Sequence, residues 1–169
     1  MKRILVPVDL SGATVRVCNA AADLAKALGS QLVILHAVPS LPPAIYGFDA
    51  FTAAQVVAFN RKARKASAHK LQALQHWFNK RLPGTKMALH EGPPADVILQ
   101  SASRINPDYI VIGSHGHGAM HDLIAGSTTR EILRKSPCPV VLVPITKSPG
   151  KPRVKTPRTT LAGVPWIYD

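Results

Sequence analysis

Cysteines and long apolar stretches are scarce in this sequence, and each scarcity excludes a class of protein. Two cysteines in 169 residues, Cys18 and Cys138, form neither a disulfide framework nor a metal-ligand spacing, so we expect unreactive thiols. No apolar stretch approaches the length of a membrane span, and the short run after Lys2 and Arg3 is too brief for a signal peptide. A cytoplasmic protein without a membrane span is therefore expected.

Acidic residues are also few. The sequence contains nine Asp and Glu residues and 21 Lys and Arg residues, which gives a formal net charge of +12. This excess favours anionic partners, namely nucleotides, nucleic acids or a membrane surface, although its sign alone does not choose among them. The length and a hydrophobic content of 46% fit one globular domain with a buried core.

Apolar runs and turn residues alternate along the chain in a β-α order. Near-continuous apolar runs predict buried strands over residues 3–9, 31–38, 86–91, 108–113 and 140–145. Helical spacing predicts helices from Ser11 or Gly12 to Gly29, over residues 52–82, from Pro93-Pro94 onward, and after Gly126. These elements predict a doubly wound α/β fold with a parallel sheet and helices on both faces.

Two stretches depart from this order. Residues 39–51 form an apolar, Pro-rich loop that suits a lid or a contact surface. Residues 146–169 form a basic, Pro-rich tail after a domain that we place at residues 1–145.

The most informative stretch joins the fourth strand to the last helix. The strand ends in Gly113-Ser114-His115-Gly116, and Gly126-Ser127-Thr128 opens the helix. Glycines let backbone N–H groups approach a ligand closely, and a helix start favours phosphate. The spacing fits neither the P-loop nor the dinucleotide fingerprint. We favour a phosphate site over a simple tight turn.

Three further segments accompany this loop: the opening strand Ile4 to Asp9, the turn His90-Glu91-Gly92 followed by Pro94-Ala95-Asp96, and the run Pro137 to Pro144. Together with the loop, they resemble the ATP-binding branch of the universal stress protein family over residues 2–145. The resemblance implies an adenine nucleotide alpha hydrolase-like fold with five strands in the order 3-2-1-4-5. In such sheets, ligands bind where the strand order reverses, here between Asp9 and Gly113.

The resemblance also implies ATP, accompanied by Mg²⁺, as the cofactor. It places one group of residues beside adenosine: Pro7, Val8, Asp9 and Ala37. It places a second group around the triphosphate, with the Ser127 hydroxyl on a phosphate oxygen: Gly113, Ser114, His115, Gly116, Gly126, Ser127 and Thr128.

Two sites have alternative interpretations. Asp9 could cap the first helix, or bind ribose or magnesium, and these roles are compatible. His115, His117 and His121, with Asp122 nearby, could instead hold zinc or copper, although they lack a recognised ligand spacing. The remaining histidines are interpreted as structural or surface residues: His36, His69, His76 and His90.

No spacing identifies a general base for Ser114 or Ser127, so we expect at most slow ATP hydrolysis or autophosphorylation. The favoured hypothesis is a nucleotide-binding module that regulates an unknown protein partner. An apolar edge strand over residues 139–145 and the family resemblance predict a homodimer through that strand.

Two other functions remain open. The first is binding of nucleic acid or another polyanion by residues 146–169 and a basic helix face, which contains Arg61, Lys62, Arg64, Lys65 and Lys70. The second is an adenylating or ATP-cleaving enzyme on the same scaffold.

Overall fold

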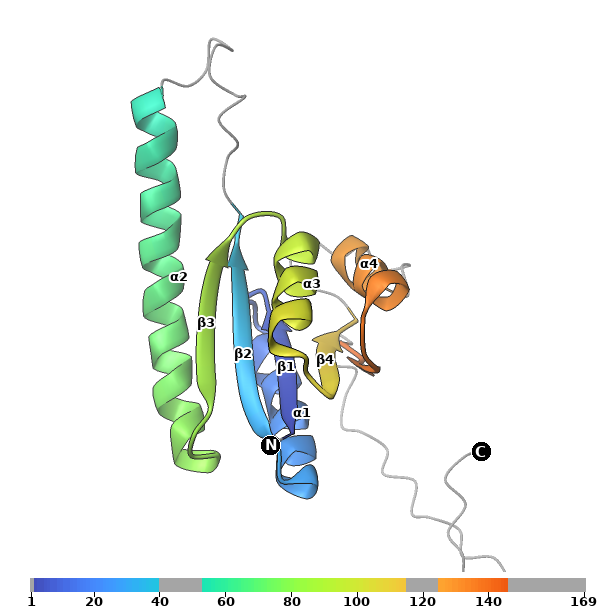
Figure 1. Cartoon of the computed structure of the whole chain (residues 1–169). Coiled ribbons are helices and arrows are strands. Elements are labelled where there is room, and N and C mark those ends of the chain that lie inside the picture. The colour runs from blue at the N-terminus through green and yellow to red at the C-terminus, as the bar shows by residue number, and fades with distance from the viewer. Residues whose placement is uncertain (1, 40–52, 115–124, 146–169) are drawn as a thin grey trace, which may run out of the picture.

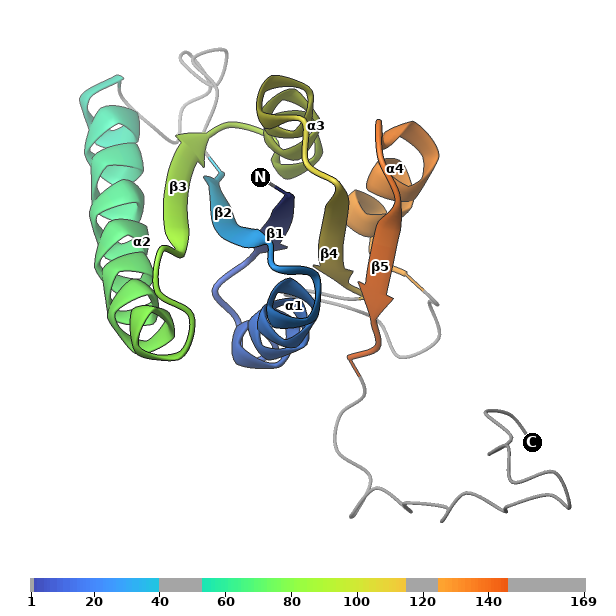
Figure 2. The ribbon, with the colours of Figure 1, turned by 60° about the horizontal axis from the view of Figure 1, so that its bottom comes forward.

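The computed structural model describes residues 2–39, 53–114 and 125–145. In this part of the chain, five parallel strands form one sheet in the order β3-β2-β1-β4-β5, and four helices cover it (Figures 1 and 2). The predicted fold class and strand order are confirmed. The elements are β1 (Arg3–Val8), α1 (Thr14–Leu28), β2 (Gln31–Val38), α2 (Ala53–Arg81), β3 (Lys86–Glu91), α3 (Pro94–Ile105), β4 (Tyr109–Gly113), α4 (Ser127–Lys135) and β5 (Val140–Val143).

The sheet separates two apolar layers. Successive side chains of β1 point to opposite faces, so Ile4 and Val6 pack with α1 and α2, whereas Leu5 packs with α3 and α4. Figure 2 shows α1 on one side of the sheet and α3 and α4 on the other. Because both faces are covered, the central strands are buried, as their apolar runs predicted.

Local signals explain most helix ends. Gly29 ends α1 at φ 59°, a left-handed conformation that glycine adopts without strain, and its N–H donates to the Ala25 and Lys26 carbonyls. Pro94 begins α3, as expected. The predicted start of α1 at Ser11 or Gly12 is wrong. Ser11 instead forms a turn, in which its hydroxyl accepts from the Ala13 N–H at 3.2 Å.

β1 pairs unequally with its two neighbouring strands. β1 pairs with β2 along its whole length, up to Val8 opposite His36, but with β4 only at Ile4 and Leu5. Pro7 has no backbone N–H to donate, which favours the end of the β1–β4 ladder before this residue. The carboxyl ends of β1 and β4 are therefore not paired at the point where the strand order reverses.

β5 forms one edge of the sheet and is shorter than the predicted strand of residues 140–145. It ends at Val143, because the Ile145 N–H donates to the Ser114 hydroxyl oxygen at 2.9 Å instead of continuing the ladder. Val141 and Leu142 are each 37% exposed, so the expected apolar edge strand is present.

The predicted lid, most of the glycine loop and the basic tail fall within residues 40–52, 115–124 and 146–169, which lie outside the described part. None of the described helices combines the length and apolar character needed to cross a membrane.

Candidate functional site

Two turns from different parts of the chain meet at the carboxyl end of β4. The Gly126 N–H donates to the Ser114 carbonyl at 2.9 Å, and the buried Thr129 hydroxyl donates to the Gly113 carbonyl at 3.0 Å. These two bonds hold the start of α4 against the end of β4. The predicted glycine positions Gly113 and Gly126 are therefore side by side.

Ser114 ties this junction to the neighbouring strand. Its N–H donates to the Val143 carbonyl at 2.8 Å, and its side-chain oxygen accepts from the Ile145 N–H. The backbone N–H groups of Ser114 and Gly126 are thus engaged within the protein, which corrects the expected role of the Ser114 amide as a phosphate donor. The first amides of a helix have no intrahelical acceptor, so Ser127 and Thr128 are the better placed donors.

The described residues around Gly126 do not require a glycine there. Its φ of −64° and ψ of 163° are accessible to any residue. A Cβ atom built on it would lie 3.9 Å from the Ser114 carbonyl oxygen, which is ordinary contact. Among the described residues, there is therefore room for a methyl group where the sequence has none.

Asp9 lies at the carboxyl end of β1 and is half-buried. Its Oδ1 accepts a hydrogen bond from the Ser11 N–H at 3.0 Å. Ala13, not Asp9, is the N-cap of α1, and the structure shows no side-chain cap there. The interpretation of Asp9 as the N-cap of α1 is therefore wrong, because its carboxylate accepts a hydrogen bond within the turn between β1 and α1.

The predicted adenosine positions Pro7, Val8 and Ala37 are buried at the same end of the sheet. Next to them, the buried His36 ring donates from Nδ1 to the Val8 carbonyl at 2.8 Å. This bond clamps the ends of β1 and β2 together. The structural interpretation of His36 is confirmed.

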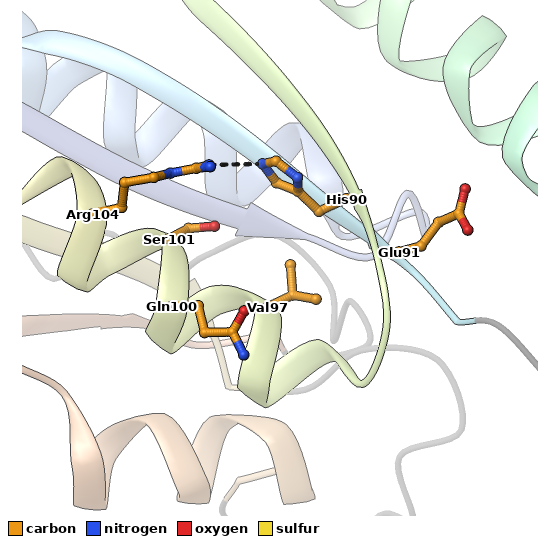
Figure 3. Close-up of a pocket in the computed structure, with 6 residues that line it drawn as sticks. All are labelled: His90, Glu91, Val97, Gln100, Ser101 and Arg104. Atoms are coloured by element: carbon orange, nitrogen blue, oxygen red, sulfur yellow. Dashed lines mark hydrogen bonds between the residues drawn. The ribbon is translucent and has the colours of Figure 1, made fainter. Parts of the chain in front are cut away.

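A separate hollow of about 260 Å³ lies between β3 and α3 (Figure 3). The Arg104 guanidinium donates to His90 Nε2 at 3.1 Å across it, a contact that needs an unprotonated Nε2. Glu91 points away and forms an ion pair with Arg64 of α2 at 2.6 Å. The hollow contains none of the predicted nucleotide residues; it is lined by His90, Glu91, Val97, Gln100, Ser101 and Arg104.

The structure tests the expectation for the two cysteines, but it does not describe the three histidines considered as zinc or copper ligands. Within residues 2–39, 53–114 and 125–145, no three His, Cys, Asp or Glu side chains group as metal ligands. His115, His117, His121 and Asp122 lie outside this part, as does Gly116. Both cysteines are free, as expected. Burial raises the pKa of Cys18 to about 12. The pKa of Cys138 is also raised, and burial is the main cause.

Residues 1–144 match the model of the universal stress protein family. The chain belongs to the universal stress protein family. Universal stress protein Sll1654 from Synechocystis is 34% identical over 143 residues, which cover 85% of both chains. The structure of the universal stress protein UspA from Lactobacillus plantarum has a TM-score of 0.74 at 24% identity, over 84% of this chain and 97% of that one.

Two solved universal stress proteins with the same fold were determined with nucleotides. One is in complex with cAMP, with a TM-score of 0.52 and 20% identity, over 84% of this chain and 95% of that one. The other is an Arabidopsis thaliana family protein with AMP bound, with a TM-score of 0.58 and 18% identity, over 90% and 98% of the two chains.

Sequence reasoning missed two residues that build this site. Thr129 bonds across the β4–α4 junction through its hydroxyl, whereas the Ile145 backbone N–H bonds to Ser114 from the segment that follows β5. Thr129 stands next to the Gly126-Ser127-Thr128 turn, and its position in the first turn of α4 was the available signal. Nothing in the sequence marks Ile145.

Proposed function

We propose that this universal stress protein binds ATP with Mg²⁺ between the carboxyl ends of β1 and β4. The observation that carries the proposal is Gly126, a glycine that neither its backbone conformation nor the atoms of the described residues around it require. A bound phosphate that approaches this backbone closely accounts for the missing side chain. The adenine nucleotides in two solved relatives support this choice of ligand.

The phosphates lie against the start of α4. Ser127 is exposed there, and the partial positive charge of the helix start favours an anion beside the Ser127 hydroxyl and the Thr128 amide. Gly113 and the loop residues His115 and Gly116 complete the cradle.

Adenosine lies beside the first two strands. The β1–β4 ladder ends at Leu5, so Pro7 and Val8 lie beyond its last pair, and Ala37 lies one residue beyond the partner of Val8. Asp9, at the end of β1, contributes a carboxylate for Mg²⁺ held by the nucleotide.

The protein acts as a cytoplasmic regulatory module in a stress response, in which bound nucleotide favours one conformation toward a protein partner. It functions as a homodimer through the strand that contains Val141 and Leu142. These side chains are exposed and apolar, and an edge strand presents unpaired backbone groups to a second chain.

Isothermal titration with ATP and Mg²⁺ tests the phosphate contact through Ser127→Ala, with Ser103→Ala on the exposed side of α3 as a matched control. Both serines are exposed helical residues. Loss of a hydrogen bond to a charged phosphate costs about 1.5–3 kcal/mol, so Ser127→Ala should weaken binding by about ten- to one-hundred-fold. Equal affinities of the two variants would show that ATP does not contact this hydroxyl.

A further inference from the structure

α2 has a charge that its role in the fold does not explain. It is 29 residues long and contains no Asp or Glu, yet it carries seven basic residues: Arg61, Lys62, Arg64, Lys65, Lys70, Lys80 and Arg81. Only Val56, Leu71 and Phe78 are buried. A helix of this length spans about 43 Å, whereas the six residues of the adjacent β3 span about 20 Å.

Some of these cations have partners within the protein. Arg64 forms the ion pair with Glu91, and Arg81 stacks over the Trp77 ring at 5.0 Å and donates to Asn19 at 3.2 Å. These contacts set Arg64 and Arg81 apart from the other basic residues of α2.

Five of the seven basic residues remain, and helix geometry separates them. At 3.6 residues per turn, Lys62, Lys65 and Lys80 fall within about 60° of one another, directly opposite the three buried side chains, whereas Lys70 lies about 100° away. We call these three lysines and the two histidines between them the outer stripe, with Arg61 at its flank: Lys62, Lys65, His69, His76 and Lys80. All of them are exposed, and the stripe runs about 27 Å along the helix. Figure 1 shows α2 at the margin of the molecule, beside the edge strand β3.

We infer that the outer stripe binds the phosphate backbone of double-stranded nucleic acid, without reading base sequence. Duplex DNA carries one negative charge per about 1.7 Å of its axis, so it presents about 16 phosphates along the length of the stripe. Lys and Arg supply such backbone contacts, and a basic stripe along a helix in a protein of pI about 10.2 is their electrostatic signature.

An anionic membrane fits the outer stripe less well. Helices that lie in a membrane interface bury an apolar face in the lipid. In α2, the buried face is directed at the sheet, and the exposed apolar side chains Val57, Phe59 and Trp77 lie about 90° or more away from the stripe's centre. The stripe itself contains no apolar side chain.

The test is the salt dependence of binding to a 20-base-pair duplex DNA of arbitrary sequence, measured by fluorescence anisotropy on the full chain. The stripe variant is Lys62→Gln with Lys65→Gln. The control is Lys26→Gln with Arg134→Gln, which removes the same charge from exposed positions on α1 and α4. Circular dichroism checks that both variants fold.

Each phosphate contact contributes about −0.9 to the slope of log K against log salt. The stripe variant should therefore have a slope about 1.8 units shallower than the parent. When the salt concentration rises from 50 to 200 mM, the parent should therefore lose about 12-fold more affinity than the stripe variant. This factor is the fourfold rise in salt raised to the power 1.8. The control should keep the parent's slope.

Three results would overturn the inference. The first is that both double variants lose affinity equally, which would mean that net charge alone attracts DNA. The second is absence of binding by the parent at 50 mM salt. The third is stripe-dependent binding to phosphatidylserine vesicles without binding to the duplex. Because the nucleotide cradle is not altered, these results are independent of the proposed ATP site.

Discussion

The substitution Thr129→Val tests how the start of α4 is held against β4. Valine has nearly the shape of threonine, so it removes the hydroxyl that donates to the Gly113 carbonyl without leaving a cavity. Thr129 is 5% exposed, and loss of a buried hydrogen-bond partner costs about 1–3 kcal/mol. With a urea dependence of about 2 kcal/mol per molar, the midpoint of urea unfolding should fall by about 0.5–1.5 M.

Thr129→Ser is the matched control, because it keeps the hydroxyl and loses a methyl group worth about 0.8 kcal/mol. We expect its midpoint to lie between those of the parent and Thr129→Val, and circular dichroism can follow all three proteins. The reasoning is refuted if Thr129→Val unfolds at the parent's midpoint, or if the serine variant loses as much stability as the valine variant.

Three further substitutions give distinct readouts. Burial raises the pKa of Cys18 from 9.0 to about 12, so its stability contribution is complete below pH 9 and decreases above it by about 1.4 kcal/mol per pH unit up to about pH 12. Urea unfolding across this range should have a shallower pH dependence in Cys18→Ala, and an unchanged dependence would contradict the assignment. Asp9→Asn keeps an acceptor for the Ser11 N–H, so it should preserve the turn but abolish the enhancement of ATP binding by Mg²⁺ in calorimetry; retention of that enhancement would exclude Asp9 as the magnesium ligand. Val141→Lys should convert a dimer into a monomer in light scattering, whereas Val57→Lys on the exposed side of α2 should not, and a dimer that persists in Val141→Lys would exclude the β5 edge as the interface.

The sequence predicts best those features that depend on neighbouring residues. Gly29 and Pro94 mark a helix end and a helix start, because their backbone preferences act locally. The start of α1 was misplaced, since the Ser11 side chain satisfies the Ala13 N–H in a turn that competes with the helix. The strand order was implied by the family resemblance, and periodicity could not have supplied it.

The candidate site depends more on tertiary contacts. Gly113 and Gly126 were identified because glycine at such positions is a local signal. The engagement of the Ser114 amide by Val143 requires β5 to lie beside β4, so it could not be deduced from the loop sequence. The same holds for the Thr129 hydroxyl and for the end of the β1–β4 ladder at Leu5, since each requires its partner strand to be in place.

The most direct test of the central claim is calorimetric titration of nucleotide-free protein with ATP and Mg²⁺, for the parent and Gly126→Ala. The methyl group would come no closer than 3.9 Å to any atom of the described residues, and alanine in place of glycine at an N-cap costs about 1 kcal/mol or less, so the variant should remain folded. We predict saturable binding by the parent and at least tenfold weaker binding by the folded variant. Absence of binding by the parent, or equal affinity in the two proteins, would contradict a nucleotide held against Gly126.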